Sequence, residues 1–274
     1  MQTTNVLLSG QGSYQFDQLD DHIQTQEFNR LAYQAKLLAP IEKNIWHQLE
    51  LSPGQRILDL GCGPGIITHA LADYVYPGEV VGIDKSQELI SSLKKQGSQT
   101  NITFCCGDIY DLAFEQQFDI VYARLLFQHL TDPLKALETI RKLLKPGGKV
   151  CILDVDDDWA SVYPEPESFA RLRQKVTQRQ QVLGGDPWVG RKLASYAHKA
   201  GFTPVETMIQ LIDSNRLGLD NFFELLSLGA HYRSQKQDFD ELGIVHQDIQ
   251  NLIKNSPAWA GFGLFVVVGH KPKT

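Results

Sequence analysis

Apolar residues along this chain occur in short runs that alternate with segments of helical spacing. Between residues 56 and 154, such runs are rich in β-branched residues and occupy Arg56–Leu60, Glu79–Ile83, Ile102–Cys106, Phe118–Tyr122 and Lys149–Asp154. Between them lie segments such as Leu89–Lys95 and Leu134–Leu144, where apolar side chains recur three or four residues apart. Near-continuous apolar strands joined by helices predict a parallel sheet covered on both faces, as in doubly wound α/β proteins.

The flanks of this region add further elements to the predicted sheet. An N-terminal helix is expected because Phe28, Leu31, Ala35 and Leu38 recur at helical spacing. Later in the chain we expect helices over 166–183 and 189–200, a strand over 203–212, a mostly helical run over 221–254 and a last strand over 263–269. The predicted fold is a Rossmann-like, mostly parallel, seven-stranded sheet with a helical N-terminal segment and a late helical insertion that forms a lid.

This order of elements divides the chain into three parts. Residues 1–45 are expected to form an N-terminal helical lid segment, and residues 46–160 the ligand-binding α/β core. Residues 161–274 would complete the sheet and carry the lid insertions.

Composition narrows the possible partners. The 274 residues carry a net charge of −6 without a long Lys/Arg run, which disfavours nucleic acid as a partner. Four cysteines, of which Cys105 and Cys106 are adjacent, form neither a disulfide framework nor a paired metal site. The longest uncharged apolar stretch, around Trp259–Gly269, is shorter than the roughly 20 residues of a membrane-spanning helix, and no signal-peptide pattern begins the chain. We expect a cytoplasmic protein without membrane insertion, and a homo-oligomer is left open.

The most informative segment is the turn after the first predicted strand. Ile57-Leu58-Asp59-Leu60 leads into Gly61-Cys62-Gly63-Pro64-Gly65, so that three glycines stand at alternate positions. Glycines accept unusual φ angles and let a ligand approach the backbone closely. A dinucleotide-binding turn needs a further glycine where this chain has Ile66, so a dinucleotide phosphate is not the expected ligand.

This turn resembles the first motif of class I S-adenosylmethionine (SAM) dependent methyltransferases. In that family the glycines cradle the methionine half of the cofactor. The resemblance implies SAM as the cofactor, and it implies that the residues of this turn contribute to its site: Asp59, Gly61, Cys62, Gly63 and Gly65.

Acidic residues follow the second and third predicted strands. Asp84 closes Val80-Val81-Gly82-Ile83 about 20 residues after the glycine turn, where a carboxylate can accept hydrogen bonds from both ribose hydroxyls. Lys85 follows it and is included in the predicted site. Gly107-Asp108-Ile109 resembles the adenine site of the family, in which Asp108 would accept from the exocyclic amine and the backbone N–H of Ile109 would meet the ring.

The fourth run and the N-terminal helix resemble the family further. By this resemblance the carbonyl of Ala123 would accept from the amino group of the cofactor, and Arg124 would lie near its carboxylate or the acceptor. The segment lacks the Asn-Pro-Pro-Tyr sequence of enzymes that methylate exocyclic or side-chain amide nitrogens. The flanks are similar to small-molecule methyltransferases of quinone and natural-product biosynthesis, which implies that Tyr14, Arg30 and Gln34 close over the methionine end. The alternative is that Arg30 and Gln34 lie on the wet face of an amphipathic helix.

Transfer of a sulfonium methyl needs mainly a positioned acceptor and exclusion of water. Where the acceptor must lose a proton, histidine is the side chain whose ordinary pKa suits the task. His129, just beyond the fourth strand, is the first candidate, and His231 in the expected lid is the second. His129 could instead be a structural histidine packed at the start of a helix. The acidic run at Asp154–Trp159 borders the expected pocket, and one of its carboxylates could bind the acceptor or serve as the base. One short run does not complete an octahedral metal site, so no metal is predicted.

The sequence therefore favours an enzyme that transfers a methyl group from SAM to a small-molecule O-, N- or C-nucleophile. One alternative is a methyltransferase for protein or RNA, which would need an extended basic groove. Another is a SAM-binding scaffold without turnover.

Overall fold

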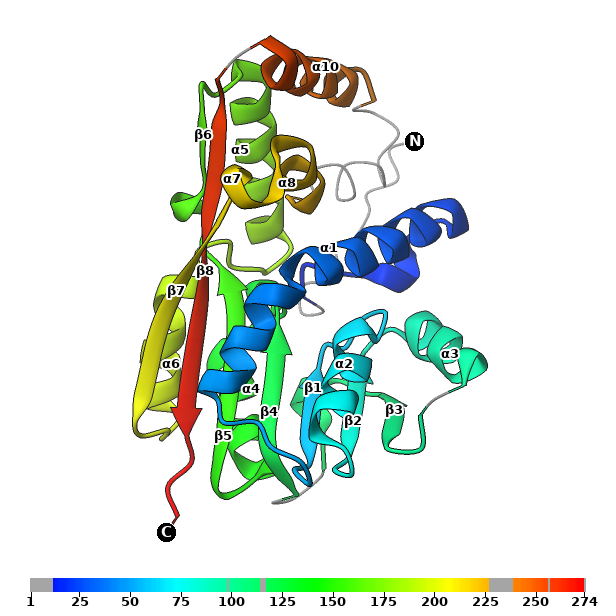
Figure 1. Ribbon diagram of the computed structural model, residues 1–274, viewed down its shortest axis with the longest axis vertical. Coiled ribbons are helices and arrows are strands. Elements are labelled where there is room, and N and C mark those ends of the chain that lie inside the picture. The colour runs from blue at the N-terminus through cyan, green and yellow to red at the C-terminus, as the bar shows by residue number, and fades with distance from the viewer. Residues whose placement is uncertain (1–11, 98, 114–116, 227–238, 256, 274) are drawn as a thin grey trace, which may run out of the picture.

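One twisted sheet runs through the molecule, and its neighbouring strands follow the order β3-β2-β1-β4-β5-β8 (Figure 1). The computed structural model describes residues 12–273 apart from residues 98, 114–116, 227–238 and 256. Within them the strands are β1 Ile57–Leu60, β2 Val80–Asp84, β3 Ile102–Cys106, β4 Phe118–Arg124, β5 Leu144–Val155, β6 Ser161–Tyr163, β7 Val205–Asp213 and β8 Trp259–His270. The first five strands are parallel, whereas β8 runs antiparallel to β5, β6 and β7.

Helices connect these strands and cover the sheet. They are α1 Asp21–Gln48, α2 Ile66–Val75, α3 Gln87–Gln96, α4 Pro133–Leu143, α5 Glu167–Val182, α6 Leu193–Lys199, α7 Ser214–Leu217, α8 Leu219–Leu225 and α10 Phe239–Asn255. None of the helices in the described part of the chain is long and apolar enough to cross a membrane.

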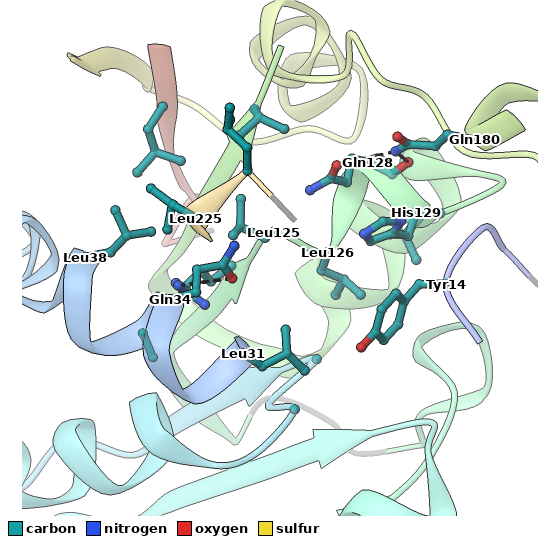
Figure 2. A pocket seen from close by; sticks show the side chains of 18 of the residues that line it. Tyr14, Leu31, Gln34, Leu38, Leu125, Leu126, Gln128, His129, Gln180 and Leu225 are labelled. Carbon is teal, nitrogen blue, oxygen red and sulfur yellow. Dashed lines mark hydrogen bonds between the residues drawn. The ribbon is translucent and has the colours of Figure 1, made fainter. Parts of the chain in front are cut away.

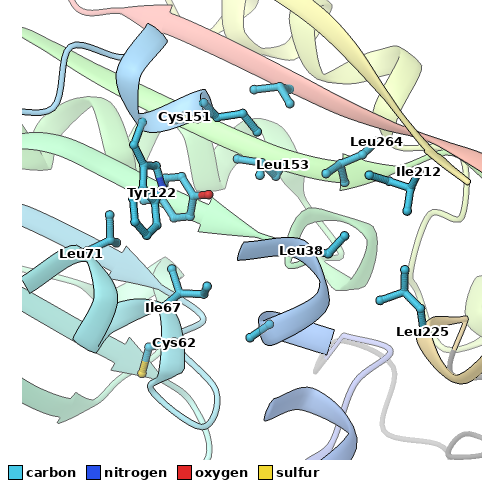
Figure 3. Close-up of a cluster of buried hydrophobic side chains, with 14 of the residues drawn as sticks. Leu38, Cys62, Ile67, Leu71, Tyr122, Cys151, Leu153, Ile212, Leu225 and Leu264 are labelled. Atoms are coloured by element: carbon cyan, nitrogen blue, oxygen red, sulfur yellow. The ribbon is translucent and has the colours of Figure 1, made fainter. Parts of the chain in front are cut away.

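Alternate strand residues point to two separate clusters of buried side chains. Ile57 and Tyr122 belong to the cluster on the face covered by α1, α2 and α3, several members of which are drawn in Figure 3. Leu58 and Val121 point the other way and pack against α4 and α6. Each fully buried aliphatic or aromatic side chain contributes about 1.5–3 kcal/mol to folding, so both faces stabilise the sheet. The predicted doubly wound fold is confirmed.

Several boundaries differ from the expected ranges, and two differences concern whole elements or turns. A short strand, β6, pairs with the start of β8 and gives an eight-stranded sheet. Its three residues are too few to show a period in the sequence. The N-terminal helix continues past Pro40 to Gln48, because Ile45 and Trp46 bury a further turn of its apolar face.

Strand order sets the place of the candidate site. β1 lies between β2 and β4. After β1 the chain adds β2 and β3 along one edge direction of the sheet, and it then returns to add β4 on the opposite side of β1. At such a switch point the loops after the two strands diverge and leave a crevice at their carboxyl ends.

Candidate functional site

A cavity of about 290 Å³ occupies this crevice. One half is lined by the loops after β1, β2, β3 and β4, and the other by α1, α5, α8 and β8. We call these the loop half and the helix half.

The glycine turn forms the floor of the loop half. Gly61, Gly63 and Gly65 have φ angles of +73°, +50° and +74°, in the left-handed region that favours glycine. Gly63 lines the cavity, and a Cβ added there would meet no other atom within 4 Å. Gly65 has a different role, because a Cβ there would lie 2.8 Å from Leu93 Cδ2 of α3.

Asp84 stands beside this turn at the end of β2. Its Oδ2 accepts from the backbone N–H of Gly63 at 2.9 Å, and its Oδ1 accepts from that of Ser86 at 2.9 Å. Burial raises the pKa of Asp84, while these two hydrogen bonds act in the opposite direction. Each carboxylate oxygen can accept a second hydrogen bond, so Asp84 retains capacity for ligand hydroxyls.

Asp59 does not line the cavity. Its carboxyl is buried beneath the glycine turn and accepts from the Thr68 hydroxyl at 2.6 Å. Burial raises the pKa of Asp59 to about 7, far above the ordinary value of about 3.9.

We expect Asp59→Asn to flatten the dependence of stability on pH. Between about pH 4 and 7 the native state holds a proton on Asp59 that the unfolded state has lost, so the free energy of unfolding falls as pH rises through this window. An asparagine cannot ionise and can still accept from Thr68. Denaturant unfolding at pH 5 and pH 8 measures the difference.

The matched control for this prediction is Asp73→Asn, on an exposed position of α2. The free energy of unfolding of Asp59→Asn should still fall somewhat as pH rises, because burial also raises the pKa of Asp154 to about 7. Identical slopes in the wild type and Asp59→Asn would contradict the prediction.

A buried polar network covers the loop half from the side of α1. Arg30 donates from Nε to Glu27 Oε2 at 2.8 Å and from Nη2 to Glu27 Oε1 at 2.7 Å, and the Tyr14 hydroxyl donates to the same Oε1 at 2.9 Å. Burial raises the pKa of Tyr14 well above its ordinary value. Arg30 Nη1 is buried without a hydrogen-bond partner among the described residues. Since an unpaired buried donor is costly, this atom indicates a place for an acceptor on a ligand.

A second network lies further along α1. Arg124 Nε lies 2.7 Å from Glu42 Oε1, and the Glu42 side chain is fully buried. Glu42 also accepts from the Tyr122 hydroxyl at 2.8 Å, and Arg124 makes a longer contact of 3.5 Å with Gln34 Oε1. The charge of Arg124 is thus balanced before any ligand binds.

The chain bends sharply where β4 ends. Leu125 has a φ of +51°, a left-handed conformation that is unfavourable for a side chain with a Cβ. It lines the cavity, and its backbone N–H donates to the carbonyl of Leu153 at 2.7 Å. Backbone strain of this kind concentrates at functional sites.

His129 lies in the short helical turn that follows, Phe127–His129, and lines the cavity. Its Nδ1 is 2.8 Å from the Ser13 hydroxyl, and its ring lies 5.3 Å from that of Tyr14. Figure 2 shows His129 and Tyr14 beside each other on the same side of the cavity. The second candidate, His231, lies outside the described residues.

All four carboxylates of the acidic run at the end of β5 already have partners, and that of Asp158 accepts from Arg191 Nη2 at 2.8 Å. Asp154 accepts from backbone N–H groups, Asp156 forms an ion pair with Arg191, and Asp157 accepts from the Thr177 hydroxyl at 2.8 Å. Burial raises the pKa of Asp157, which borders the cavity. Within the described parts of the chain, no three His, Cys, Asp or Glu side chains converge as metal ligands.

The helix half is mostly apolar. Figure 2 shows Leu31 and Leu38 of α1 opposite Leu125 and Leu225, and aromatic side chains of α5, α8 and β8 complete the wall. The aromatic members are Phe169, Phe222 and Phe262. Gln180 projects from α5 and donates to the carbonyl of Gln128 at 3.0 Å, which adds a polar edge.

Most of the predicted site residues line this cavity. They are Tyr14, Arg30, Gln34, Gly61, Cys62, Gly63, Asp84, Lys85, Asp108, Ile109, Arg124 and His129. Asp59, Gly65 and Ala123 lie outside its wall, and the Ala123 side chain is fully buried in the sheet. The predicted contact to the Ala123 carbonyl stays a prediction.

Sequence reasoning missed Ser13, Glu42 and the polar pair of Gln128 and Gln180. Glu42 carried a signal, because it follows Leu38 by four residues on the apolar face of α1 and an acid there must be buried with a partner. Nothing in the sequence distinguishes Ser13 or Gln180 from surface polar residues.

Comparison with known proteins adds to this geometry. Residues 51–201 match the family model described as "Methyltransferase domain". An uncharacterized methyltransferase of Schizosaccharomyces pombe is 39% identical over 158 residues, which are 54% of this chain and 56% of that protein. The ubiquinone biosynthesis O-methyltransferase of Coxiella burnetii is 30% identical over 209 residues, which are 74% of this chain and 79% of that protein.

A solved structure agrees in fold. The phosphoethanolamine N-methyltransferase 2 of Haemonchus contortus, in complex with S-adenosyl-L-methionine, superposes with a TM-score of 0.59 at 21% identity over 94% of this chain and 60% of that chain. The chain matches only about half the length of the first curated relatives.

Proposed function

The chain belongs to the class I SAM-dependent methyltransferases, and from this premise we propose that it methylates a small, uncharged and largely apolar acceptor. The observation that carries the proposal is the apolar helix half of the cavity, next to a loop half that fits SAM. The name of the Coxiella burnetii relative, a ubiquinone biosynthesis O-methyltransferase, is consistent with such an acceptor.

The loop half has the donors and acceptors that SAM requires. We assign the ribose hydroxyls to Asp84 and the adenine to Asp108 and Ile109, which line one end of the cavity. The methionine carboxylate is assigned to Arg30, because the unpartnered Nη1 of a buried guanidinium calls for an anionic acceptor. The open space at Gly63 lets the same ligand lie against the backbone.

SAM supplies an activated methyl group. The protein therefore has to position the acceptor, exclude water from the site and, where needed, accept a proton. Leu31, Leu125 and Leu126 exclude water where the two halves of the cavity meet. His129 is assigned as the base that takes a proton from an acceptor hydroxyl. The Tyr14 hydroxyl is committed to Glu27 and is not assigned to this role.

The charges around the helix half favour an uncharged acceptor. Arg124 is paired with Glu42, and Arg173 of α5 lies 3.2 Å from a carboxylate oxygen of Glu165. A phosphate group on the acceptor would have to compete with these carboxylates. An apolar acceptor would instead be bound more tightly by about 25 cal/mol for each Å² of its surface that the apolar wall covers.

We also propose that α1 and the helices between β7 and β8 act as the lid over the acceptor. Leu38 of α1 and Leu225 of α8 lie close together in Figure 2, and both line the cavity. Both helices would have to move apart for an acceptor of ring size to enter.

Formation of S-adenosylhomocysteine from SAM with matched acceptors tests the proposed function. Neutral phenols and hydroquinones should be methylated, and the same compounds carrying a phosphate ester should react at least tenfold more slowly. Turnover restricted to phosphorylated amines, peptides or RNA would overturn the assignment. Tight SAM binding without turnover of any acceptor would favour a non-catalytic scaffold.

A further inference from the structure

A segment of the N-terminal region crosses the loop half of the cavity and is attached at both ends. We call residues 12–19 the strap. At one end the backbone N–H of Ser13 donates to the carbonyl of His129 at 3.0 Å. At the other end Asp17 accepts from the backbone N–H of Gln87, at the start of α3, at 2.9 Å. Between the two attachments Tyr14 lines the cavity.

The Ser13 side chain occupies a closely fitted niche against His129. Its hydroxyl oxygen is 2.8 Å from His129 Nδ1, and the residue is only 5% exposed. The neighbouring position in the loop after α5 is Gly185, where an added Cβ would lie 2.4 Å from the Ser13 hydroxyl. The niche therefore admits the serine only because residue 185 has no side chain.

We propose that Ser13 is a positioning residue that holds the imidazole of His129 by its Nδ1. The proposal rests on the proposed function of His129 as the base. In the proposed arrangement Nδ1–H donates to the Ser13 hydroxyl, so Nε2 is the nitrogen that accepts the proton. As the acceptor oxygen bonds to the methyl carbon, the carbon–sulfur bond breaks with its electrons left on sulfur, and the hydroxyl proton passes to Nε2.

The far attachment of the strap leads back to the assigned ribose site. Asp17 also accepts from the Ser86 hydroxyl, and the backbone N–H of Ser86 donates to Asp84 Oδ1 at 2.9 Å. Hydrogen bonds thus connect the carboxylate assigned to the ribose with the strap that delivers Ser13. Docking of the strap at Asp17 and orientation of His129 are expected to occur together.

Ser13→Ala tests the positioning role. We expect the single-turnover rate to fall about tenfold, as for loss of one hydrogen bond to a reacting group, with the dissociation constant of S-adenosylhomocysteine unchanged within about twofold. Nitrogen NMR of the imidazole should change from one tautomer to a mixture. Gln18→Ala on the exposed face of the strap is the matched control and should leave the rate and the tautomer unchanged.

A second variant tests delivery by the strap. Asp17→Ala removes the far attachment at an exposed position and should produce the same mixture of tautomers to a smaller extent. An unchanged tautomer and rate in Ser13→Ala would overturn the positioning role, as would a loss of rate that only parallels a lower melting temperature. If His129→Asn has a normal rate while Ser13→Ala still alters the tautomer, His129 is not the base, but Ser13 still positions its imidazole.

Discussion

His129→Asn is expected to slow methyl transfer by about 10²–10⁴-fold, the range for loss of a general base. Asparagine can keep a hydrogen bond to Ser13 but cannot accept a proton at neutral pH, so binding and orientation should survive while proton removal is lost. The dependence of the rate on pH near neutrality should disappear with the imidazole. Single-turnover transfer to a hydroxyl acceptor, measured together with thermal unfolding, separates the chemical effect from a structural one.

The matched control for this variant is His198→Asn, an exposed histidine in α6 that does not line the cavity. It should leave both measurements unchanged. A destabilised His129→Asn protein with near-normal turnover would remove His129 from the catalytic assignment. In that case the remaining candidates are His231, a carboxylate of the acidic run at the end of β5, or an acceptor that needs no protein base.

The second large effect is expected for Asp84→Ala, which should weaken cofactor binding by about 1.5–3 kcal/mol, or about 10- to 150-fold. The carboxylate at the end of β2 is the assigned acceptor for the ribose hydroxyls. Calorimetric titration with S-adenosylhomocysteine measures the loss. Asp84→Asn keeps one oxygen acceptor and nearly the same side-chain shape. It should show a smaller loss of affinity, which separates the effect of the carboxylate from that of side-chain volume.

The same titration as a function of pH sharpens this test. Burial raises the pKa of Asp84, so its charge is lost at a higher pH than that of an ordinary carboxyl. Cofactor affinity in the wild type should therefore fall as pH falls through this raised pKa, and the affinity of Asp84→Ala should not follow. Unchanged affinity in Asp84→Ala, with a normal melting curve, would place the ribose elsewhere.

The loop half of the cavity could be predicted because its residues are grouped along the sequence. The turn from Gly61 to Gly65 carries its own backbone requirement, and Asp84 and Asp108 each follow a strand whose apolar run is evident. In a parallel sheet the ends of such strands must meet at one edge. Their convergence follows from topology alone.

The helix half could not be predicted because its wall is built from distant segments. Leu38, Phe169, Phe222 and Phe262 come from three helices and a strand, and their residue types are those of any protein core. Whether an apolar side chain faces a cavity or a neighbouring side chain is decided by packing, which a single sequence does not record. The polar contacts of this region are equally distant, since Ser13 and His129 are 116 residues apart.

The N-terminal helix illustrates an ambiguity that packing resolved. Arg30 and Gln34 could have lain on its wet face, but the structure places both on the cavity wall. The reason is that Glu27 and Glu42 on the same helix are buried and need partners, which Arg30, Tyr122 and Arg124 provide. Polar residues on the covered face of a helix thus looked, in the sequence, like an ordinary amphipathic pattern.

The pairing of β7 with β8 has a consequence for how this enzyme could acquire new acceptors. Their antiparallel ladder extends to the pair formed by Asp213 and Gly261, so both ends of the intervening helical insertion are fixed side by side. Loop-closure entropy grows only slowly with length, and here the ladder already holds the two ends together. The insertion can therefore be lengthened, shortened or replaced as a unit. The residues assigned to SAM lie on other elements and would keep their positions.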